Sequence, residues 1–281
     1  MRAIVLGAGG QVGRALTAAL PDATALRHSD LDIADAADAP IDWAAYDTVI
    51  NAAAFTDVDG AETAEGRPAA WRANAVGPSA LAAICHRTGA TLVHLSTEYV
   101  FDGRSADPYP EDAPVAPLSA YGASKAAGDL AVRTLERYYL VRPTWVVGDG
   151  RNFVRTMLRL AEKGVEPTVV ADQVGRLTFA PDLAAAIVHL VASGAPYGSY
   201  HVTNGGEPAS WADVARATFE LAGHGDLKVT DTTTEEYFAD KPQAARRPRN
   251  SVLDLSRAAA AGVRLPDWRG RLEEYVRSLA S

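Results

Sequence analysis

The stretch Gly7-Ala8-Gly9-Gly10-Gln11-Val12-Gly13 decides the fold of this chain. It follows the apolar run Ala3–Leu6 and opens a segment whose apolar residues recur at helical spacing as far as Leu20. A strand, a glycine-rich turn and an amphipathic helix in this order are typical of a dinucleotide site, where backbone N–H groups and the helix N-terminus face a pyrophosphate. A purely structural corner would also use glycine, but the position after the first strand favours Gly7, Gly10, Gln11, Val12 and Gly13 as cofactor contacts.

Alternating apolar strands and helices continue from this turn. Strands are predicted at 3–6, 24–26, 48–50, 91–95 and 138–141, and helices at about 69–87 and 119–135. Apolar strands separated by helices are typical of a parallel sheet buried on both faces. The sequence therefore predicts an α/β fold with a doubly wound parallel Rossmann sheet.

The pattern changes in the second half of the chain. Residues 102–117 contain four prolines and predict a long surface loop, and 148–152 predict a turn. Beyond Gly194 the alternation is irregular, with helices expected at 211–221, 255–261 and 269–279. We expect a dinucleotide-binding domain over residues 1–147, to which about 165–202 return, and a smaller, mostly C-terminal substrate-binding lobe over 148–281.

Composition restricts the function classes. The 281 residues carry 27 basic and 35 acidic side chains, and a net charge of −8 disfavours nucleic-acid binding. No apolar run approaches the roughly 18 residues of a membrane span. The single cysteine, Cys85, cannot form an intrachain disulfide, and the six histidines lack metal-ligand spacing. We expect a cytoplasmic protein that binds no metal, no membrane and no nucleic acid.

The end of the second strand bears on the choice of dinucleotide. An acid there binds the ribose hydroxyls of NADH, whereas an arginine accommodates the 2′-phosphate of NADPH. This chain has Leu26-Arg27-His28, which favours NADPH, with NADH as a possible second cofactor and a solvated Arg27 as the alternative interpretation. Asp32 and Ile33 follow closely and are placed to flank the adenine.

Three residues suggest carbonyl chemistry. Tyr121 and Lys125 are four residues apart in a predicted helix and so share one face. An ammonium beside a phenol stabilises the phenolate, which lowers the tyrosine pKa. Thr97 follows the strand at 91–95, at the sheet edge where ligands bind, and is placed to hydrogen-bond a carbonyl oxygen.

The sequence resembles the extended short-chain dehydrogenase/reductases and, within them, the dTDP-4-dehydrorhamnose reductase family. The resemblance covers nearly the whole chain. It rests on the stretches 7–13, Asn51 to Asp59, Ser96-Thr97-Glu98-Tyr99-Val100-Phe101-Asp102-Gly103, 121–125, 142–145, 152–153, Asp172-Gln173-Val174-Gly175 and 247–251.

This resemblance implies an NADPH-dependent reduction of the C4 keto group of a dTDP-4-keto-6-deoxy-L-hexose, with dTDP-4-dehydro-L-rhamnose favoured. Tyr121 would donate the proton, Lys125 would hold the nicotinamide ribose, and Thr97 would orient the carbonyl. Glu98 and Trp145 would line the sugar pocket. Further cofactor contacts would come from Ala54, Phe55, Thr56 and Leu95.

Two departures from the family pattern matter. The family commonly has Asp where this chain has Glu98, so the accepted hydroxyl pattern can differ. Some members hold Mg²⁺ between subunits through glutamates, one of them in the first helix, where this chain has Ala15. We therefore expect no such metal, and either a monomer or a homodimer.

A basic segment stands out against the acidic background. Lys241, Arg246, Arg247 and Arg249 lie in nine residues that include no acid. Guanidinium groups suit phosphate oxygens, so we expect Arg247 to bind the diphosphate of a sugar nucleotide. A solvated charged loop is the alternative interpretation.

Other functions remain open on the sequence. A dehydratase would need a second acid after Thr97 and Glu98, where Tyr99 stands. A 4-epimerase would keep Tyr121 and Lys125 but resembles the chain less closely in the other motifs. A reductase of another dTDP-4-ketohexose, such as an antibiotic deoxysugar precursor, fits the same residues. So does a non-catalytic dinucleotide-binding regulatory subunit.

Overall fold

A six-stranded parallel sheet forms the centre of the computed structural model, which describes residues 1–280. Its strands are β1 (Ala3–Leu6), β2 (Thr24–Leu26), β3 (Thr48–Asn51), β4 (Thr91–Leu95), β5 (Tyr138–Arg142) and β10 (Gly198–His201). They lie in the order β2-β1-β3-β4-β5-β10, with every neighbouring pair parallel. The predicted doubly wound sheet is confirmed, and β1, β2 and β4 have the predicted bounds.

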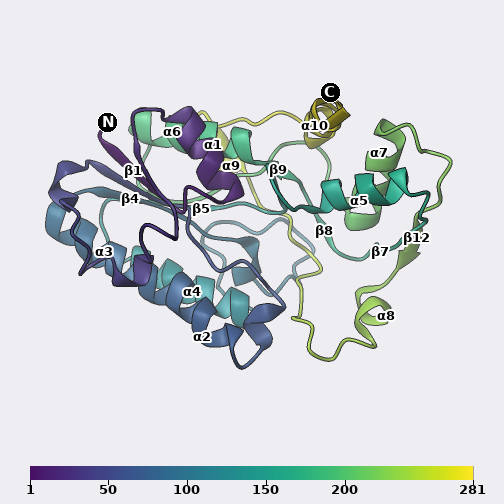
Figure 1. Cartoon of the computed structure of the whole chain (residues 1–281), viewed down its shortest axis with the longest axis horizontal. Coiled ribbons are helices and arrows are strands. Elements are labelled where there is room, and N and C mark those ends of the chain that lie inside the picture. The colour runs from purple at the N-terminus through teal and green to yellow at the C-terminus, as the bar shows by residue number, and fades with distance from the viewer. Residues whose placement is uncertain (281) are drawn as a thin grey trace.

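Helices cover both faces of this sheet because successive strand residues point to opposite sides. In β1, Ala3 and Val5 pack with α1 (Gln11–Ala19) and α6 (Ala180–Ala192). Ile4 and Leu6 pack on the other face with α3 (Gly77–Thr88). Figure 1 shows α1 and α6 on one side of the sheet and α2 (Gly66–Trp71), α3 and α4 (Ala120–Val132) on the other.

The carboxyl edge of the sheet contains a topological switch point. Strand β1 pairs with β2 on one side and with β3 on the other, so the chain reverses its direction of progress across the sheet there. Open α/β sheets bind ligands in the crevice at such a point. The glycine turn follows β1 and Thr97 follows β4, so both lie at this edge.

The helix predicted over 69–87 is interrupted. It consists of α2, a π-helical turn η4 (Arg72–Val76) and α3, which follow one another directly. A π turn adds one residue to the helical path and so changes which side chains face a neighbour. Here it brings the buried Asn74 inward, toward α4.

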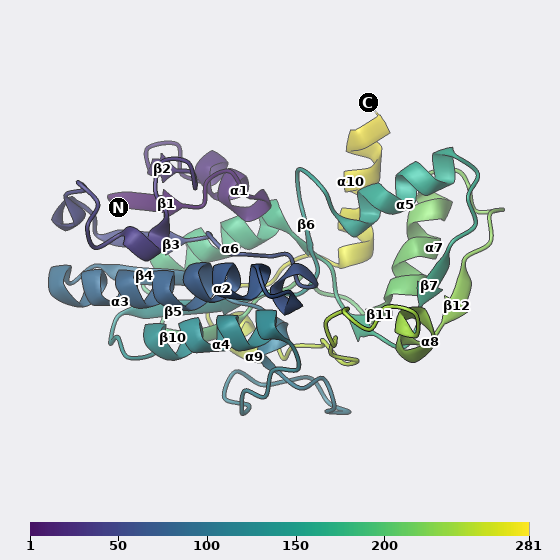
Figure 2. The same cartoon turned by 60° about the horizontal axis from the view of Figure 1, so that its bottom comes forward.

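A second group of elements lies beside the sheet (Figure 2). Three short strand pairs belong to it, namely β6 (Val146–Val147) with β9 (Thr178–Phe179), β7 (Thr168–Val170) with β12 (Thr230–Thr232), and β8 (Val174–Gly175) with β11 (Ala209–Ser210). Its helices are α5 (Phe153–Glu162), α7 (Trp211–Leu221), α8 (Thr234–Phe238) and α10 (Trp268–Ala280). Two further apolar clusters fill its interior, one around Trp268 and one around Phe219.

The later chain also contributes to the sheet region. Strand β10 extends the sheet, and α6 and α9 (Ser256–Ala260) pack against the same core. Short 3₁₀ turns connect other elements, namely η1 (Ile33–Asp35), η2 (Trp43–Ala45), η3 (Gly60–Glu62) and η5 (Glu98–Val100). The loop predicted at 102–117 contains no helix or strand, and a bridge from Tyr109 to Leu253 fixes it to the C-terminal part of the chain.

The described part of the chain contains neither a membrane-spanning helix nor a cluster of metal-ligating side chains. No helix within residues 1–280 is both long and apolar enough to cross a membrane. Within the same residues, no group of three or more His, Cys, Asp or Glu side chains is placed to hold a metal ion. Cys85 is buried as a free thiol, and burial raises its pKa to about 12.

Candidate functional site

The turn after β1 needs glycine at two positions. Gly7 has φ of +78°, and a Cβ there would lie 2.5 Å from the backbone nitrogen of Ala53. A Cβ on Gly13 would overlap the carbonyl oxygen of Gly7. At Gly10, by contrast, the nearest atom to an added Cβ is 3.4 Å away. Gly7 and Gly13 therefore shape the turn, and the space beside Gly10 stays open.

The N-terminus of α1 can accept a phosphate. Gly10 caps this helix, and no side chain among residues 1–280 hydrogen-bonds there as a cap. The first turn of α1 has no acidic residue, so its free N–H groups and the positive end of the helix dipole are available to an anion. This arrangement fits the pyrophosphate of a dinucleotide.

A cavity of about 440 Å³ adjoins this turn. Six of the predicted cofactor residues line it, namely Gly7, Gly10, Asp32, Ile33, Ala54 and Phe55. The other predicted contacts lie around it in different roles. The Gln11 side chain accepts a hydrogen bond from the Gly148 amide at 2.9 Å, Val12 packs on the sheet core, and Thr56 is exposed.

This cavity contains a charged contact that the sequence did not predict. Arg72, on the π turn, lines the cavity, and its Nε donates to Asp32 at 2.9 Å. Asp32 also caps η1 by accepting from the Ala34 amide at 3.0 Å. Arg27 is exposed beside Gly9, while its neighbour His28 lines the cavity. Asp32 is thus already paired with the guanidinium of Arg72, which also lines the cavity.

Helix α4 carries the tyrosine and the lysine to the carboxyl edge of β4. Its N-cap, Ser119, accepts a hydrogen bond from the Gly122 amide at 3.1 Å, which fixes the start of the helix. Tyr121 lies in the first turn and Lys125 one turn later. The Lys125 ammonium donates to the carbonyl oxygen of Leu95 at 2.6 Å. This bond ties α4 to β4 two residues before Thr97.

The pKa of Tyr121 differs from the value expected beside Lys125. Burial raises the pKa of Tyr121, the Glu98 charge raises it further, and the Thr97 hydroxyl offsets only part of the rise. Burial lowers the pKa of Lys125 to about 8, against the opposing effect of Asp129. The expected lowering of the tyrosine pKa is therefore not found, because desolvation by burial is the largest effect and the Glu98 charge acts in the same direction. Tyr121 holds its proton at neutral pH.

Glu98 is buried next to Thr97. The Thr97 hydroxyl donates to its carboxylate at 2.8 Å and accepts from the Tyr99 amide at 3.2 Å. Burial raises the pKa of Glu98 to about 7, and hydrogen bonds from Thr97 and Ser251 limit the rise. The Thr97 hydroxyl is thus hydrogen-bonded to a buried carboxyl group whose pKa is raised toward neutrality.

Trp145 lies where β5 leads into the second group of elements. It has φ of +42°, which is unusual for a bulky residue, and its ring stacks on Trp211 with centroids 3.8 Å apart. Phe153 packs against Trp211 in turn, with ring centroids 4.5 Å apart. The predicted pocket wall is therefore part of an aromatic cluster.

This cluster adjoins a cavity of about 520 Å³. Phe153, Trp211, Tyr237 and Phe238 supply aromatic surface to the cavity, and Lys241 and Arg247 supply positive charge. Asp59 also lines it, from the segment after β3. An aromatic wall with cations at one end suits a nucleotide base and its phosphates.

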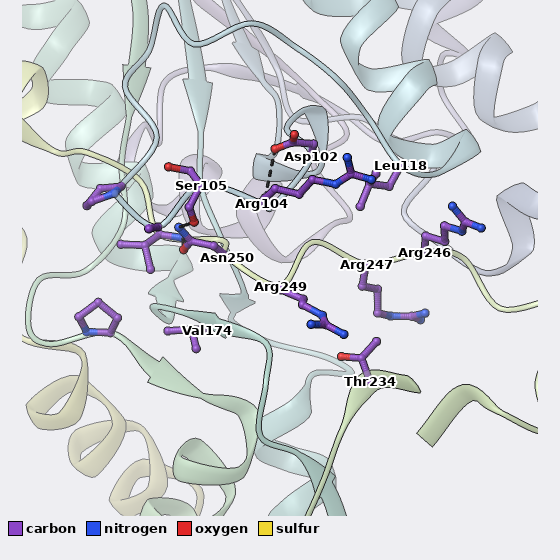
Figure 3. Close-up of a pocket in the computed structure, with 15 residues that line it drawn as sticks. Asp102, Arg104, Ser105, Leu118, Val174, Thr234, Arg246, Arg247, Arg249 and Asn250 are labelled. Atoms are coloured by element: carbon purple, nitrogen blue, oxygen red, sulfur yellow. Dashed lines mark hydrogen bonds between the residues drawn. The ribbon is translucent and has the colours of Figure 1, made fainter. Parts of the chain in front are cut away.

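The basic segment Lys241 to Arg249 also borders another cavity, of about 840 Å³ (Figure 3). Arg246, Arg247 and Arg249 lie along one side of it, and Arg249 points toward Thr234. Acids from elsewhere in the chain meet two of these arginines. Arg247 binds Asp59 at 2.7 Å, and Arg249 lies 3.7 Å from Asp172. The segment is therefore partly neutralised, although its own sequence has no acid.

Known proteins match the chain over its full length. The family described as the RmlD substrate binding domain matches residues 1–281. The chain belongs to this family. It is 42% identical to a dTDP-4-dehydrorhamnose reductase of Mycolicibacterium smegmatis, over 98% of this chain and 85% of that protein. A dTDP-4-keto-6-deoxy-D-glucose reductase of Streptomyces niveus is 40% identical over 93% of this chain and 91% of its own length.

A solved structure agrees with these relatives. The dTDP-4-dehydrorhamnose reductase of Bacillus anthracis, in complex with NADP, superimposes with a TM-score of 0.85 at 34% identity and covers 99% of each chain. The expected resemblance is confirmed at the level of the family.

The RmlD-family site includes buried polar residues that the sequence did not single out. Asn74 exchanges two hydrogen bonds with the backbone of Phe55 and donates to the Ser124 hydroxyl at 3.0 Å. Asp129 forms a buried ion pair with Arg142 at 3.0 Å. Tyr121, Lys125 and Asp129 follow one another at intervals of four residues, so helical spacing could have indicated that Asp129 shares their face of α4.

Proposed function

We propose that this chain is an NADPH-dependent reductase of the C4 keto group of a dTDP-4-keto-6-deoxyhexose, with dTDP-4-dehydro-L-rhamnose as the favoured substrate. The observation that carries the proposal is the trio Thr97, Tyr121 and Lys125 at the carboxyl edge of β4, beside a glycine-lined cavity, in a chain that the family model matches over residues 1–281. A regulatory subunit would have no need of this buried trio.

The chain's own residues supply binding and proton transfer. The N-terminus of α1 and the cavity beside Gly10 would hold NADPH, which supplies the hydride for carbonyl reduction when bound. Tyr121 donates its proton to the carbonyl oxygen as negative charge develops there, and the product is the C4 alcohol. Its raised pKa suits this role because the phenol stays protonated until the reaction demands the proton.

Lys125 and Thr97 support that transfer. Lys125 is cationic below its pKa of about 8, and it stabilises the phenolate that remains on Tyr121. Thr97 donates its hydroxyl proton to the same carbonyl oxygen and so orients it. We also propose that residues 148–281 largely form the substrate lobe, with Arg247 on the diphosphate and Trp145 and Glu98 beside the sugar.

A direct assay tests this proposal. Purified protein is mixed with NADPH and dTDP-4-dehydro-L-rhamnose, and the nicotinamide absorbance is followed. Rapid oxidation is expected for the wild type, and a Tyr121→Phe variant serves as the inactive control. Failure to oxidise NADPH with any ketosugar would contradict the reductase and favour a binding subunit.

A second sugar specificity follows from one residue. Glu98 is one methylene longer than the Asp that the family commonly has at this position, and it is buried beside Thr97. A longer carboxylate favours a different hydroxyl pattern on the sugar. Faster oxidation with dTDP-4-keto-6-deoxy-D-glucose than with dTDP-4-dehydro-L-rhamnose in the same assay would assign the chain to that substrate.

A further inference from the structure

The segment Asp59–Glu62 contacts two distant parts of the candidate site. Asp59 accepts from the Arg247 guanidinium at 2.7 Å and from the Ala245 amide at 2.9 Å. Three residues later, Glu62 accepts from the Ala120 amide at 2.7 Å. Ala120 is the first residue of α4 and immediately precedes Tyr121. One short segment therefore joins the arginine to the start of the helix that carries the tyrosine.

This segment is itself held rigidly. The Gly60 amide donates to the Asp57 carboxylate at 2.9 Å, and the Ala61 amide donates to the Asp57 carbonyl at 3.0 Å. Ala61 is completely buried in a small apolar cluster with Tyr121. Tyr99 packs on this cluster, and its ring lies edge-on to that of Tyr121 with centroids 5.5 Å apart. The segment cannot shift without disturbing the surroundings of Tyr121.

Arg247 is fixed in one orientation at the other end. Its guanidinium lies 4.6 Å from the centroid of the Phe238 ring, and Nη1 donates to the Ala245 carbonyl at 2.8 Å. Burial acts to raise the pKa of Asp59, but the hydrogen bonds from Arg247 and Ala245 outweigh it and hold the pKa below its usual value. Asp59 is therefore anionic at neutral pH. A guanidinium has five N–H donors, so Arg247 can bind Asp59 and a phosphate together.

We propose that Asp59 is a positioning residue, and that the segment Asp59–Glu62 is a brace that sets the distance between the Arg247 guanidinium and the Tyr121 phenol. A sugar nucleotide held by Arg247 at its diphosphate then presents its carbonyl to Tyr121. This inference rests on the proposed function. Small errors in such placement reduce rates strongly, because the reacting atoms must approach within about 3 to 3.5 Å.

The same contacts permit an opposite role, in which Asp59 competes with the diphosphate for Arg247. The two roles predict effects of opposite sign. Loss of a brace weakens substrate binding and slows turnover, whereas loss of a competitor tightens binding. The variant Asp59→Asn separates them, because it removes the charge and keeps the size of the side chain.

Steady-state kinetics of the full chain provide the test. For Asp59→Asn we expect the KM for the sugar nucleotide to rise about tenfold. We expect kcat to fall as well and the KM for NADPH to stay unchanged. The matched control is Glu65→Gln, which removes one negative charge from an exposed side chain six residues away, outside the brace. It should leave all three constants near the wild-type values, and thermal unfolding checks that both variants fold.

Coupling to Arg247 completes the test. Arg247→Met should raise the KM for the sugar nucleotide, and adding Asp59→Asn to it should change little more, because Asp59 acts through Arg247. An unchanged or lower KM in Asp59→Asn, or additive effects in the double variant, overturns the brace while the diphosphate contact stands. An unchanged KM in Arg247→Met overturns the proposed diphosphate contact, and with it the brace.

Discussion

The two sides of the candidate site differ in how they hold their polar groups. On the sheet side, Thr97, Tyr121 and Lys125 are 6%, 8% and 1% exposed, and strand ends and one helix fix them. On the C-terminal side, the Arg247 side chain is 18% exposed and that of Arg249 is 66% exposed, and both lie on irregular chain. The buried sheet-side residues, here called the frame, are those proposed for the chemistry, and the more exposed C-terminal residues, here called the surface, are those proposed to bind the ligand.

Electrostatics follow the same division. Burial shifts the pKa values of Tyr121, Lys125 and Glu98, because their charged forms lose hydration in the frame. The ion pairs of the C-terminal side are close to water and are screened. Substitutions in the frame should therefore alter kcat or stability, and substitutions on the surface should alter KM.

The substitution Tyr121→Phe is the strongest way to break this comparison. It removes the proton donor and leaves the buried ring, so we expect kcat to fall by about 10²- to 10⁴-fold with little change in either KM. The control is Tyr139→Phe, which should leave kcat unchanged. The Tyr139 hydroxyl donates to the Ala195 carbonyl in the apolar core and is not part of the proposed site. Wild-type turnover in Tyr121→Phe would refute the assignment of the proton donor.

Asp129→Asn tests whether the frame depends on buried charge. Asp129 pairs with the fully buried Arg142, and removing its charge leaves that arginine uncompensated, so we expect a loss of about 3 kcal/mol in the free energy of unfolding. Urea denaturation measures it. The exposed pair of Arg216 with Asp213 is the control, and Arg216→Met should cost less than about 1 kcal/mol. Equal losses would remove the distinction between frame and surface.

Glu98 should give the frame a pH dependence. Its pKa of about 7 makes the carboxyl group protonated below that pH and anionic above it. The protonated Glu98 carboxyl can donate a hydrogen bond to Thr97, so the Thr97 hydroxyl proton is free to bind the substrate carbonyl oxygen. The Glu98 carboxylate instead accepts the hydrogen bond from Thr97. We expect kcat to fall as pH rises through about 7, by up to tenfold per pH unit. Glu98→Gln should be flat there, and a decline that persists in it would contradict this role of Glu98.

The smallest effect is expected at Arg27, which belongs to the sheet region but is exposed. Arg27→Asp should change the ratio of the KM values for NADPH and NADH by about fivefold in favour of NADH, with kcat unaffected. This outcome would sharpen the comparison. It would show that the exposure of a side chain, and not its place in the sheet region or the C-terminal side, decides whether its substitution changes KM or kcat. An unaltered ratio would contradict the role of Arg27 and favour Arg72, which lines the cavity, as the cation that sets the cofactor preference.

Local pattern was sufficient for the sheet region and insufficient for the C-terminal side. Strands β1, β2 and β4 could be predicted to the residue because buried parallel strands are short apolar runs between turns. Tyr121 and Lys125 could be predicted as a pair because helical spacing places them together. In the second half, α7 was predicted with its observed bounds, but α5 was not among the predicted helices.

The residues that prediction missed depend on contacts between distant segments. Asp59 meets Arg247 across 188 positions of sequence, and Asn74 reaches Ser124 only because a π turn rotates it inward. Arg72 likewise meets Asp32 through the folded chain. No local pattern records such pairings. The basic segment could be found from its composition, but its partial neutralisation by Asp59 and Asp172 could not.

Trp145 combines a backbone cost with aromatic packing. Its φ of +42° is costly for a bulky residue and nearly free for glycine. The stacked Trp211 ring and the close approach to Gly175 hold the indole in place. A glycine at this position would remove the torsional cost and the stacked ring together. The junction between β5 and the second group of elements therefore depends on an aromatic stack that offsets a strained torsion angle.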